Sequence, residues 1–162
     1  MNTEIKVADY LNKVQGDEIA YLLSLYSKDP MGGGHPLDDY VIKNIAVELS
    51  KRSEAFSVIG YVDATPAGLV NCFEGFSTFA CKPLVNIHDM IVLEQFRGKG
   101  LSHKMLNKVE EIAIDRGCCK LTLEVLSGNT VAQSSYQKFG FAAYELDPVV
   151  GTAQFWQKPL KR

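Results

Sequence analysis

A strand, a turn that carries two glycines and the start of a helix follow one another directly between Ile91 and Ser102. Such a junction directs several free backbone N–H groups and the positive end of a helix dipole to one place, which favours anion binding. Gly98 and Gly100 would let the backbone approach a ligand closely, because neither carries a Cβ atom. An ordinary turn between a strand and a helix would show the same residues, so both interpretations stay open here. A Walker-type GxxxxGK[ST] pattern is absent from the chain.

Apolar periodicity and turn residues divide the rest of the chain into helices and strands. Helices are expected at 17–27 with Asp17 as the cap, 37–52, 101–116 and 131–139. Strands are expected at 4–8, 56–62, 69–73, 84–93, 120–126, 141–146 and 152–158, with a turn at 63–68. This order predicts an α+β fold around a mixed sheet. A length of 162 residues favours one domain, residues 1–162.

Composition excludes several classes of protein. Lys and Arg number 17 against 19 Asp and Glu, which gives a net charge of −2 and argues against a nucleic-acid partner. No apolar run approaches a membrane span, and no secretory signal is evident, so we expect no membrane partner and a cytoplasmic location. The four cysteines form no CxxC pair, so neither a disulfide framework nor a metal site is indicated.

Two motifs in order indicate a family. The run Gln95–Gly100 matches the pattern [QR]xxGx[GA], and Asn129 with Tyr136–Phe141 matches an "N…YxxxGF" element. Together they resemble the signature of the GCN5-related N-acetyltransferase (GNAT) superfamily. The resemblance implies a mixed, mostly antiparallel central sheet flanked by helices. It also implies an enzyme that transfers an acetyl group from acetyl-CoA to a primary amine by direct attack in a ternary complex.

The same resemblance assigns the residues that would bind the cofactor. Backbone amides over the turn would bind the pyrophosphate, at Arg97, Gly98, Lys99, Gly100, Leu101 and Ser102. The preceding strand edge would pair with the pantetheine arm, at Ile91, Val92 and Leu93. Arg97 and Lys99 would add positive charge, or would be solvated surface charges.

Two residues of the second motif have competing roles. By the resemblance, Asn129 would hydrogen-bond CoA, and Thr130 to Gln133 reads as a capping box that would leave Asn129 free for this role. The alternative is that Asn129 caps the helix. Tyr136 resembles the family's general acid, placed to protonate the leaving thiolate. The alternative for Tyr136 is packing on an amphipathic helix.

An amine acceptor must lose a proton before it attacks a thioester. His88 is the preferred base, because imidazole changes charge near neutral pH and some family members carry His at this position. Side chains alternate along a strand, so we expect His88 and Asp89 to face opposite sides of the sheet. A water relay, or a purely structural role for His88, stays open.

The acceptor site is expected from the segment after the hairpin and from the loop 29–39. Glu74, Phe76 and Asp89 are the candidate substrate-binding residues, with Phe73 and Phe79 as further apolar walls. These residues favour a small cationic amine. A covalent acyl-cysteine is less favoured, because Cys72 and Cys81 have no indicated base partner.

A second function of another class fits the same motifs. The chain would then be a noncatalytic acyl-CoA-binding module for sensing or scaffolding. Dimers are common in families of this kind, so a homodimer is an expectation that the resemblance brings.

Overall fold

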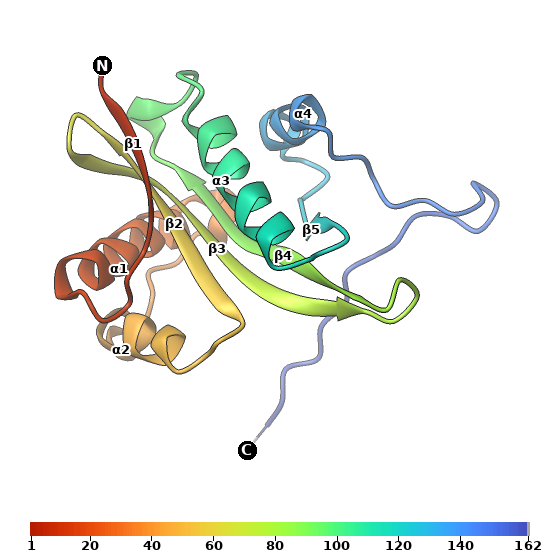
Figure 1. The fold of residues 1–162 in the computed structure, drawn as a ribbon, viewed down its shortest axis with the longest axis horizontal. Coiled ribbons are helices and arrows are strands. Elements are labelled where there is room, and N and C mark those ends of the chain that lie inside the picture. Colours follow the sequence, from red (N-terminus) through yellow and green to blue (C-terminus); the bar gives the residue numbers. More distant parts are fainter. Residues whose placement is uncertain (162) are drawn as a thin grey trace. The chain divides into compact units, whose positions relative to one another are not determined.

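The computed structural model describes residues 1–161 (Figure 1). Contacts within the chain divide it into two compact units, Met1–Leu123 and the residues from Glu124 onward. The first unit holds the sheet, and the second holds one helix and the C-terminal segment. No helix within residues 1–161 has the length and apolar character of a transmembrane span.

A five-stranded sheet in the order β1-β2-β3-β4-β5 forms the first unit (Figure 1). The strands are β1 Thr3–Val7, β2 Ala55–Val62, β3 Thr65–Ser77, β4 Lys82–Val92 and β5 Leu121–Leu123. The first four pair antiparallel, and β5 joins β4 in parallel. The predicted α+β fold with a mixed, mostly antiparallel sheet is therefore confirmed.

Helices cover both faces of this sheet. The first unit holds α1 Lys13–Lys28, η1 Pro30–Gly32, α2 Asp39–Ser50, η2 Glu94–Phe96 and α3 Leu101–Asp115, and the second unit holds α4 Thr130–Phe139. α1 and α2 close one face over a core that includes Ile19, Leu49 and Leu69. α3 packs on the opposite face, against β2, β3 and β4 (Figure 1).

Helix α1 begins four residues before the predicted start. Asn12 is its N-cap, and the Asn12 side-chain oxygen accepts from the Gln15 amide at 3.2 Å. Asp17 lies in the second turn and pairs instead with Lys13 at 2.7 Å. The predicted cap was wrong because a residue with cap chemistry also works as an ion-pair partner inside a helix.

The hairpin turn is tighter than the sequence indicated. β2 ends at Val62 and β3 begins at Thr65, so the turn consists of Asp63 and Ala64, both with positive φ. Two positive φ angles are typical of the type I′ turn, which matches the twist of the paired strands. β3 then continues through Pro66, where the register shifts against Tyr61.

The C-terminal strands predicted at 141–146 and 152–158 were wrong. Within residues 124–161 the only pairing of this kind is an isolated bridge between Glu145 and Thr152. Phe155 and Trp156 are largely exposed. A strand needs a paired neighbour as well as an alternating sequence, and this part of the chain offers none.

Two glycines let α3 lie close to the sheet. Gly60 on β2 and Gly68 on β3 are paired opposite each other. A Cβ atom on Gly60 would lie 2.9 Å from Leu101 Cδ1, and one on Gly68 would lie 2.6 Å from Met105 Cε and 2.9 Å from the Ile91 carbonyl oxygen. The close packing of α3 on the sheet therefore depends on glycine, which has no Cβ atom, at these two positions.

We predict that Gly68→Ala destabilises the protein, because the added methyl group meets backbone that cannot move aside. The expected loss in free energy of unfolding is about 1–3 kcal/mol, measured by chemical denaturation. Gly75→Ala is the matched control on the same strand, since its Cβ would lie 3.5 Å from Leu84 Cδ1, an ordinary contact. Equal stability of the two variants would contradict the close packing of α3 on the sheet at Gly68.

Candidate active site

Strand β4 has an open edge over its second half. β5 pairs only with Val85–Ile87, whereas β4 continues to Val92. Within the first unit, no strand covers residues 88–92 on that side. Exposed N–H and C=O groups of this kind form a ready template for an extended partner.

The direction of the main chain decides which residues this edge presents. The Leu93 amide donates to the Ala67 carbonyl at 2.9 Å, and Ile91 is paired with Leu69. Because hydrogen-bonding groups alternate along an antiparallel strand, Ile91 and Leu93 turn their main-chain groups to β3. Val92 turns its groups to the open edge. Among Ile91, Val92 and Leu93, Val92 is therefore the residue that presents its main-chain groups at the open edge, and the pairing of these three residues with a pantetheine arm stays a prediction.

The glycine turn after β4 leaves three amides unused. Gly98 and Gly100 have φ angles of 73° and 77°, which glycine adopts without the cost that other residues meet. The amides of Gly98, Lys99 and Gly100 donate to no group within residues 1–161. Gly100 is the N-cap of α3 and supplies no side-chain cap. The three amides and the helix N-terminus together suit an anion.

The predicted row of amides is shorter at its start. The Arg97 amide donates to the Glu94 carbonyl at 3.2 Å, so it is not available to a ligand. Leu101 and Ser102 form the first turn of α3, and their predicted amide contacts stay predictions.

The two cationic side chains of the turn bind neighbouring groups. Arg97 Nε donates to the Val92 carbonyl at 3.0 Å, and Arg97 Nη2 lies 3.8 Å from Asp29 Oδ2. Lys99 Nζ donates to the Gln95 carbonyl at 3.2 Å. Arg97 therefore connects the turn to the open edge of β4 and to the loop after α1, whereas Lys99 stays within the turn.

A β-bulge in β4 places two polar side chains on one face. Asn71 is opposite Asp89 and Cys72 is opposite Ile87, so His88 is an extra residue without a partner on β3. A bulge interrupts the alternation of side chains along a strand. His88 and Asp89 consequently both line one cavity, and the prediction that they face opposite sides of the sheet was wrong.

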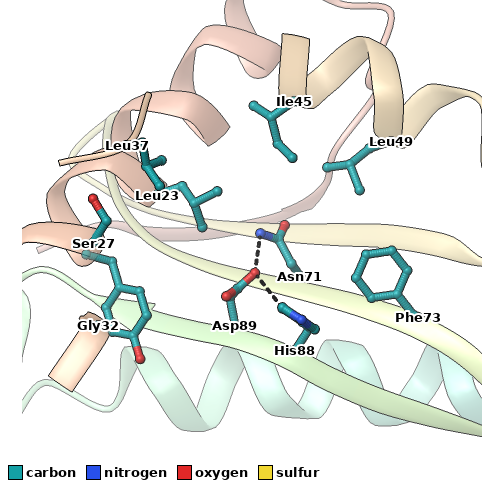
Figure 2. Close-up of a pocket in the computed structure, with 11 residues that line it drawn as sticks. Leu23, Ser27, Gly32, Leu37, Ile45, Leu49, Asn71, Phe73, His88 and Asp89 are labelled. Carbon is teal, nitrogen blue, oxygen red and sulfur yellow. Dashed lines mark hydrogen bonds and ion pairs between the residues drawn. The ribbon is translucent and has the colours of Figure 1, made fainter. Parts of the chain in front are cut away.

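The cavity has a volume of about 280 Å³ and lies between the helices α1 and α2 and the strands β3 and β4 (Figure 2). Its lining residues are Leu23, Tyr26, Ser27, Gly32, Leu37, Ile45, Leu49, Asn71, Phe73, His88 and Asp89. The walls are mostly apolar, and Asp89 is the one carboxylate among the lining residues. The pKa of Tyr26 is raised by burial and, next, by the negative charges of Asp89 and Asp29.

Asp89 is the centre of the polar contacts in this cavity. Its Oδ2 atom accepts from Asn71 Nδ2 at 3.0 Å and lies 3.3 Å from His88 Nδ1 (Figure 2). The His88 ring meets the Phe73 ring edge-on, with centroids 5.7 Å apart. Sequence reasoning missed Asn71, although a polar residue inside the apolar run of β3 signals that buried hydrogen-bond partners exist.

Two predicted acceptor residues lie elsewhere. Glu74 Oε1 accepts from Arg116 Nη1 at 3.4 Å, beside the end of α3, and Phe76 is 59% exposed near the β3–β4 turn. Neither lines the cavity. Asn71 and Phe73 point into the cavity, so the even-numbered neighbours Glu74 and Phe76 fall on the other face of β3. Phe79 is fully exposed and does not line the cavity either, so an acceptor role for Glu74, Phe76 and Phe79 stays a prediction without support from this cavity.

A family model described as "Acetyltransferase (GNAT) family" matches residues 19–141, about three quarters of the chain. The chain belongs to this family. The match includes the glycine turn, the β4 bulge and the second motif described above. Acetyl-CoA is the co-substrate of the family.

Individual relatives agree with this assignment. The thialysine N-epsilon-acetyltransferase of Bos taurus is 38% identical over 56 residues, which are 35% of this chain and 33% of that protein. This chain therefore aligns with only a third of the length of that relative. An uncharacterized N-acetyltransferase of Archaeoglobus fulgidus is 27% identical over 113 residues, which are 65% of this chain and 74% of that protein.

Solved acetyltransferases share the fold. The aminoglycoside N-acetyltransferase AAC(6')-Iy, solved in complex with CoA, superposes with a TM-score of 0.74 at 21% identity. The superposition covers 98% of this chain and 96% of that one. At this identity the likeness concerns the fold alone.

The second family motif lies on α4 in the second unit. Asn129 is the N-cap of α4, and its Oδ1 accepts from the Ala132 amide at 3.2 Å. The predicted capping box at Thr130, which would have left Asn129 free, was wrong. Tyr136 stacks edge-on with Phe141 at a centroid distance of 5.9 Å, and Gly140 ends the helix with a φ of 115°. The cofactor role of Asn129 and the acid role of Tyr136 stay predictions.

The cysteines and possible metal ligands offer no second chemistry in residues 1–161. Burial raises the pKa of the Cys72 thiol, and the Asp89 charge raises it further, so Cys72 is a poor nucleophile. Cys81 is exposed at the β3–β4 turn. No group of three His, Cys, Asp or Glu side chains in this part of the chain is placed to hold a metal ion.

Proposed function

We propose that this protein is an acetyl-CoA-dependent N-acetyltransferase that acts on a small primary amine. The observation that supports it is the arrangement along β4. The His88–Asp89 pair faces the cavity, and the open edge of the same strand leads to the unused amides of Gly98, Lys99 and Gly100. One strand therefore connects a place for an amine with a place for a phosphate.

The residues present suit acetyl-CoA. The amides of the glycine turn and the N-terminus of α3 would bind the diphosphate. The Val92 amide would donate to the amide-rich arm, while the Val92 carbonyl already accepts from Arg97 Nε. When bound, acetyl-CoA supplies a thioester whose C–S bond breaks as the amine nitrogen forms the new C–N bond, the sulfur leaving as a thiol once protonated. Asn129 and Tyr136 are assigned to cofactor binding from their motif, and we propose residues 1–162 as one catalytic domain.

Two side chains of this protein would move the protons. His88 would accept the proton that the ammonium must lose before the nitrogen can attack, either directly or through a water molecule. Its side chain is 65% exposed, so water can reach it. Tyr136 would donate the proton that the departing sulfur takes up.

The cavity indicates the kind of acceptor. Asp89 supplies a single negative charge, which attracts one ammonium group. Leu23, Leu37, Ile45 and Phe73 supply apolar surface around it. These residues suit a primary amine on an apolar body better than a polycation, whose further charges would lose their hydration without gaining partners.

A cytoplasmic location and a homodimer remain proposals. The exposed apolar side chains of Phe155, Trp156 and Leu160 support the second, because such residues often become covered by a partner.

We predict that turnover with acetyl-CoA is highest for monoamines on apolar chains or rings, such as hexylamine and phenethylamine. Polyamines, amino acids and aminoglycosides should give a lower kcat/KM, measured by thiol release and by the mass of the acetylated product. Faster turnover of a polyamine would contradict this acceptor class. CoA binding without turnover on every amine would instead support the noncatalytic sensor or scaffold.

We predict that Gly100→Ala weakens CoA binding roughly tenfold, or about 1.4 kcal/mol, because alanine is strained at a φ of 77° and would shift the turn that carries the free amides. Isothermal titration calorimetry with CoA measures this. Gly117→Ala is the matched control, since Gly117 has a φ of 74° against 77° for Gly100 and a Cβ at either position meets nothing within 4 Å. Both variants should lose similar stability, and equal CoA affinities would contradict the proposed diphosphate site.

We predict that Tyr136→Phe lowers kcat by roughly 10²-fold, within the usual contribution of a general acid, while the Kd for CoA changes little. Steady-state kinetics and calorimetry give the two values. Tyr144→Phe is the control, because Tyr144 is a largely exposed tyrosine of the same unit. An equal loss in kcat and CoA affinity would assign Tyr136 to packing or to cofactor contact.

A further inference from the structure

A chain of polar side chains crosses the sheet and ends at His88. Tyr10 and Ser57 join at 2.8 Å between their hydroxyl oxygens, and Ser57 Oγ donates to Asn71 Oδ1 at 2.6 Å. Asn71 Nδ2 donates to Asp89 Oδ2 at 3.0 Å, and the same oxygen lies 3.3 Å from His88 Nδ1. Ser57 is 0% and Asn71 3% exposed, so the middle of this chain is cut off from water.

The chemistry of each group fixes the direction of these hydrogen bonds. An ionised carboxylate only accepts, so Asn71 must present its NH₂ group to Asp89 and its carbonyl oxygen to Ser57. The Ser57 hydroxyl then donates its single hydrogen to Asn71 Oδ1, so the Tyr10 hydroxyl must be the donor to Ser57. Burial raises the pKa of Tyr10, so this phenol keeps the hydrogen that the chain requires.

The carboxylate also bears on the state of the histidine. Asp89 Oδ2 lies 3.3 Å from His88 Nδ1, and a negative charge this close favours a nitrogen that carries hydrogen over one that presents a lone pair. For neutral His88, this contact favours the tautomer with the N–H at Nδ1 and the lone pair at Nε2. Free imidazole side chains in water favour the opposite tautomer, so the nearby carboxylate would shift the balance toward the Nδ1–H form.

We propose that Asn71 is a positioning residue: by holding Asp89 against His88 Nδ1, it makes Nε2 the atom that accepts the proton of the amine. Ser57 and Tyr10 hold the Asn71 amide in the orientation that this task needs. The inference rests on the proposed function, in which His88 is the base. It adds the atom that acts and three residues that no motif of the sequence indicated.

The position of this chain argues against packing as its only role. β2, β3 and β4 are otherwise filled here with apolar residues, including Val58, Ile59 and Leu69, which are fully buried. Buried polar groups cost stability unless every partner is present, and apolar residues of similar size could fill the same space. The row of hydrogen-bonded side chains also ends at His88, the side chain in the cavity best suited to accept a proton, rather than at another buried group.

The test begins with ¹⁵N NMR of protein labelled at histidine. The protein has three histidines, and His88→Gln identifies the His88 signals by their loss. In the wild type, neutral His88 should show a protonated Nδ1 and an unprotonated Nε2. Asn71→Leu should shift the population toward the Nε2–H tautomer, and Ser57→Ala should cause a smaller shift in the same direction.

Kinetics supply the second readout, with the best amine from the acceptor panel. Asn71→Leu should lower kcat by roughly 10- to 100-fold, a part of what a general base contributes, with little change in KM for the amine or Kd for CoA. Asn86→Leu is the matched control, because Asn86 is also on the sheet and donates to Thr122 Oγ1 at 3.0 Å. Neither residue belongs to the row of polar side chains from Tyr10 to His88. Asn86→Leu should leave the His88 tautomer unchanged.

The two readouts separate the failures. An unchanged tautomer in Asn71→Leu and Ser57→Ala, or an Nε2–H form in the wild type, would overturn the positioning role whatever the turnover. If Asn71→Leu fails to fold, Ser57→Ala and Tyr10→Phe interrupt the same row of hydrogen bonds farther from His88. The His88 tautomer measured in these two variants then tests the positioning role. Absence of turnover on every amine, with the predicted NMR result intact, would overturn the proposed function and leave the tautomer assignment standing.

Discussion

The pairing of β4 with β3, with one residue too many at His88, determines the arrangement of the candidate site. Before the bulge, β4 pairs on both sides, and after it the strand keeps only β3 as a neighbour. The extra residue turns His88 and Asp89 to the same face and so gives the cavity both an imidazole and a carboxylate. The cavity chemistry and the open edge therefore begin at the same point of the chain.

Local patterns in the sequence were sufficient for most elements and for the glycine turn. Periodicity located α3 and α4 to within a residue or two. The two glycines marked the turn before α3, where the structure gives both a positive φ. The bulge in β4 could not be predicted from the sequence, because His88 is an extra residue only in comparison with the residues of β3 that pair with β4. Period-two alternation would have excluded Glu74 had Asn71 been known to face the cavity.

The first unit accepts a cost in stability to hold its polar groups. Ser57 and Asn71 occupy positions where apolar residues would pack without hydrogen-bond requirements. The same unit places glycines where a helix must approach closely and where free amides are needed. Such local departures from the simplest packing are expected where a protein binds or reacts rather than where it only folds.

The paired glycines under α3 have a consequence for choosing which residues to alter. Gly60 and Gly68 lie beneath the helix whose first turn follows the free amides, and a methyl group on either would push against Leu101 or Met105. Mutagenesis guided by the glycine turn alone would pass over both residues, although the spacing between α3 and the sheet depends on them.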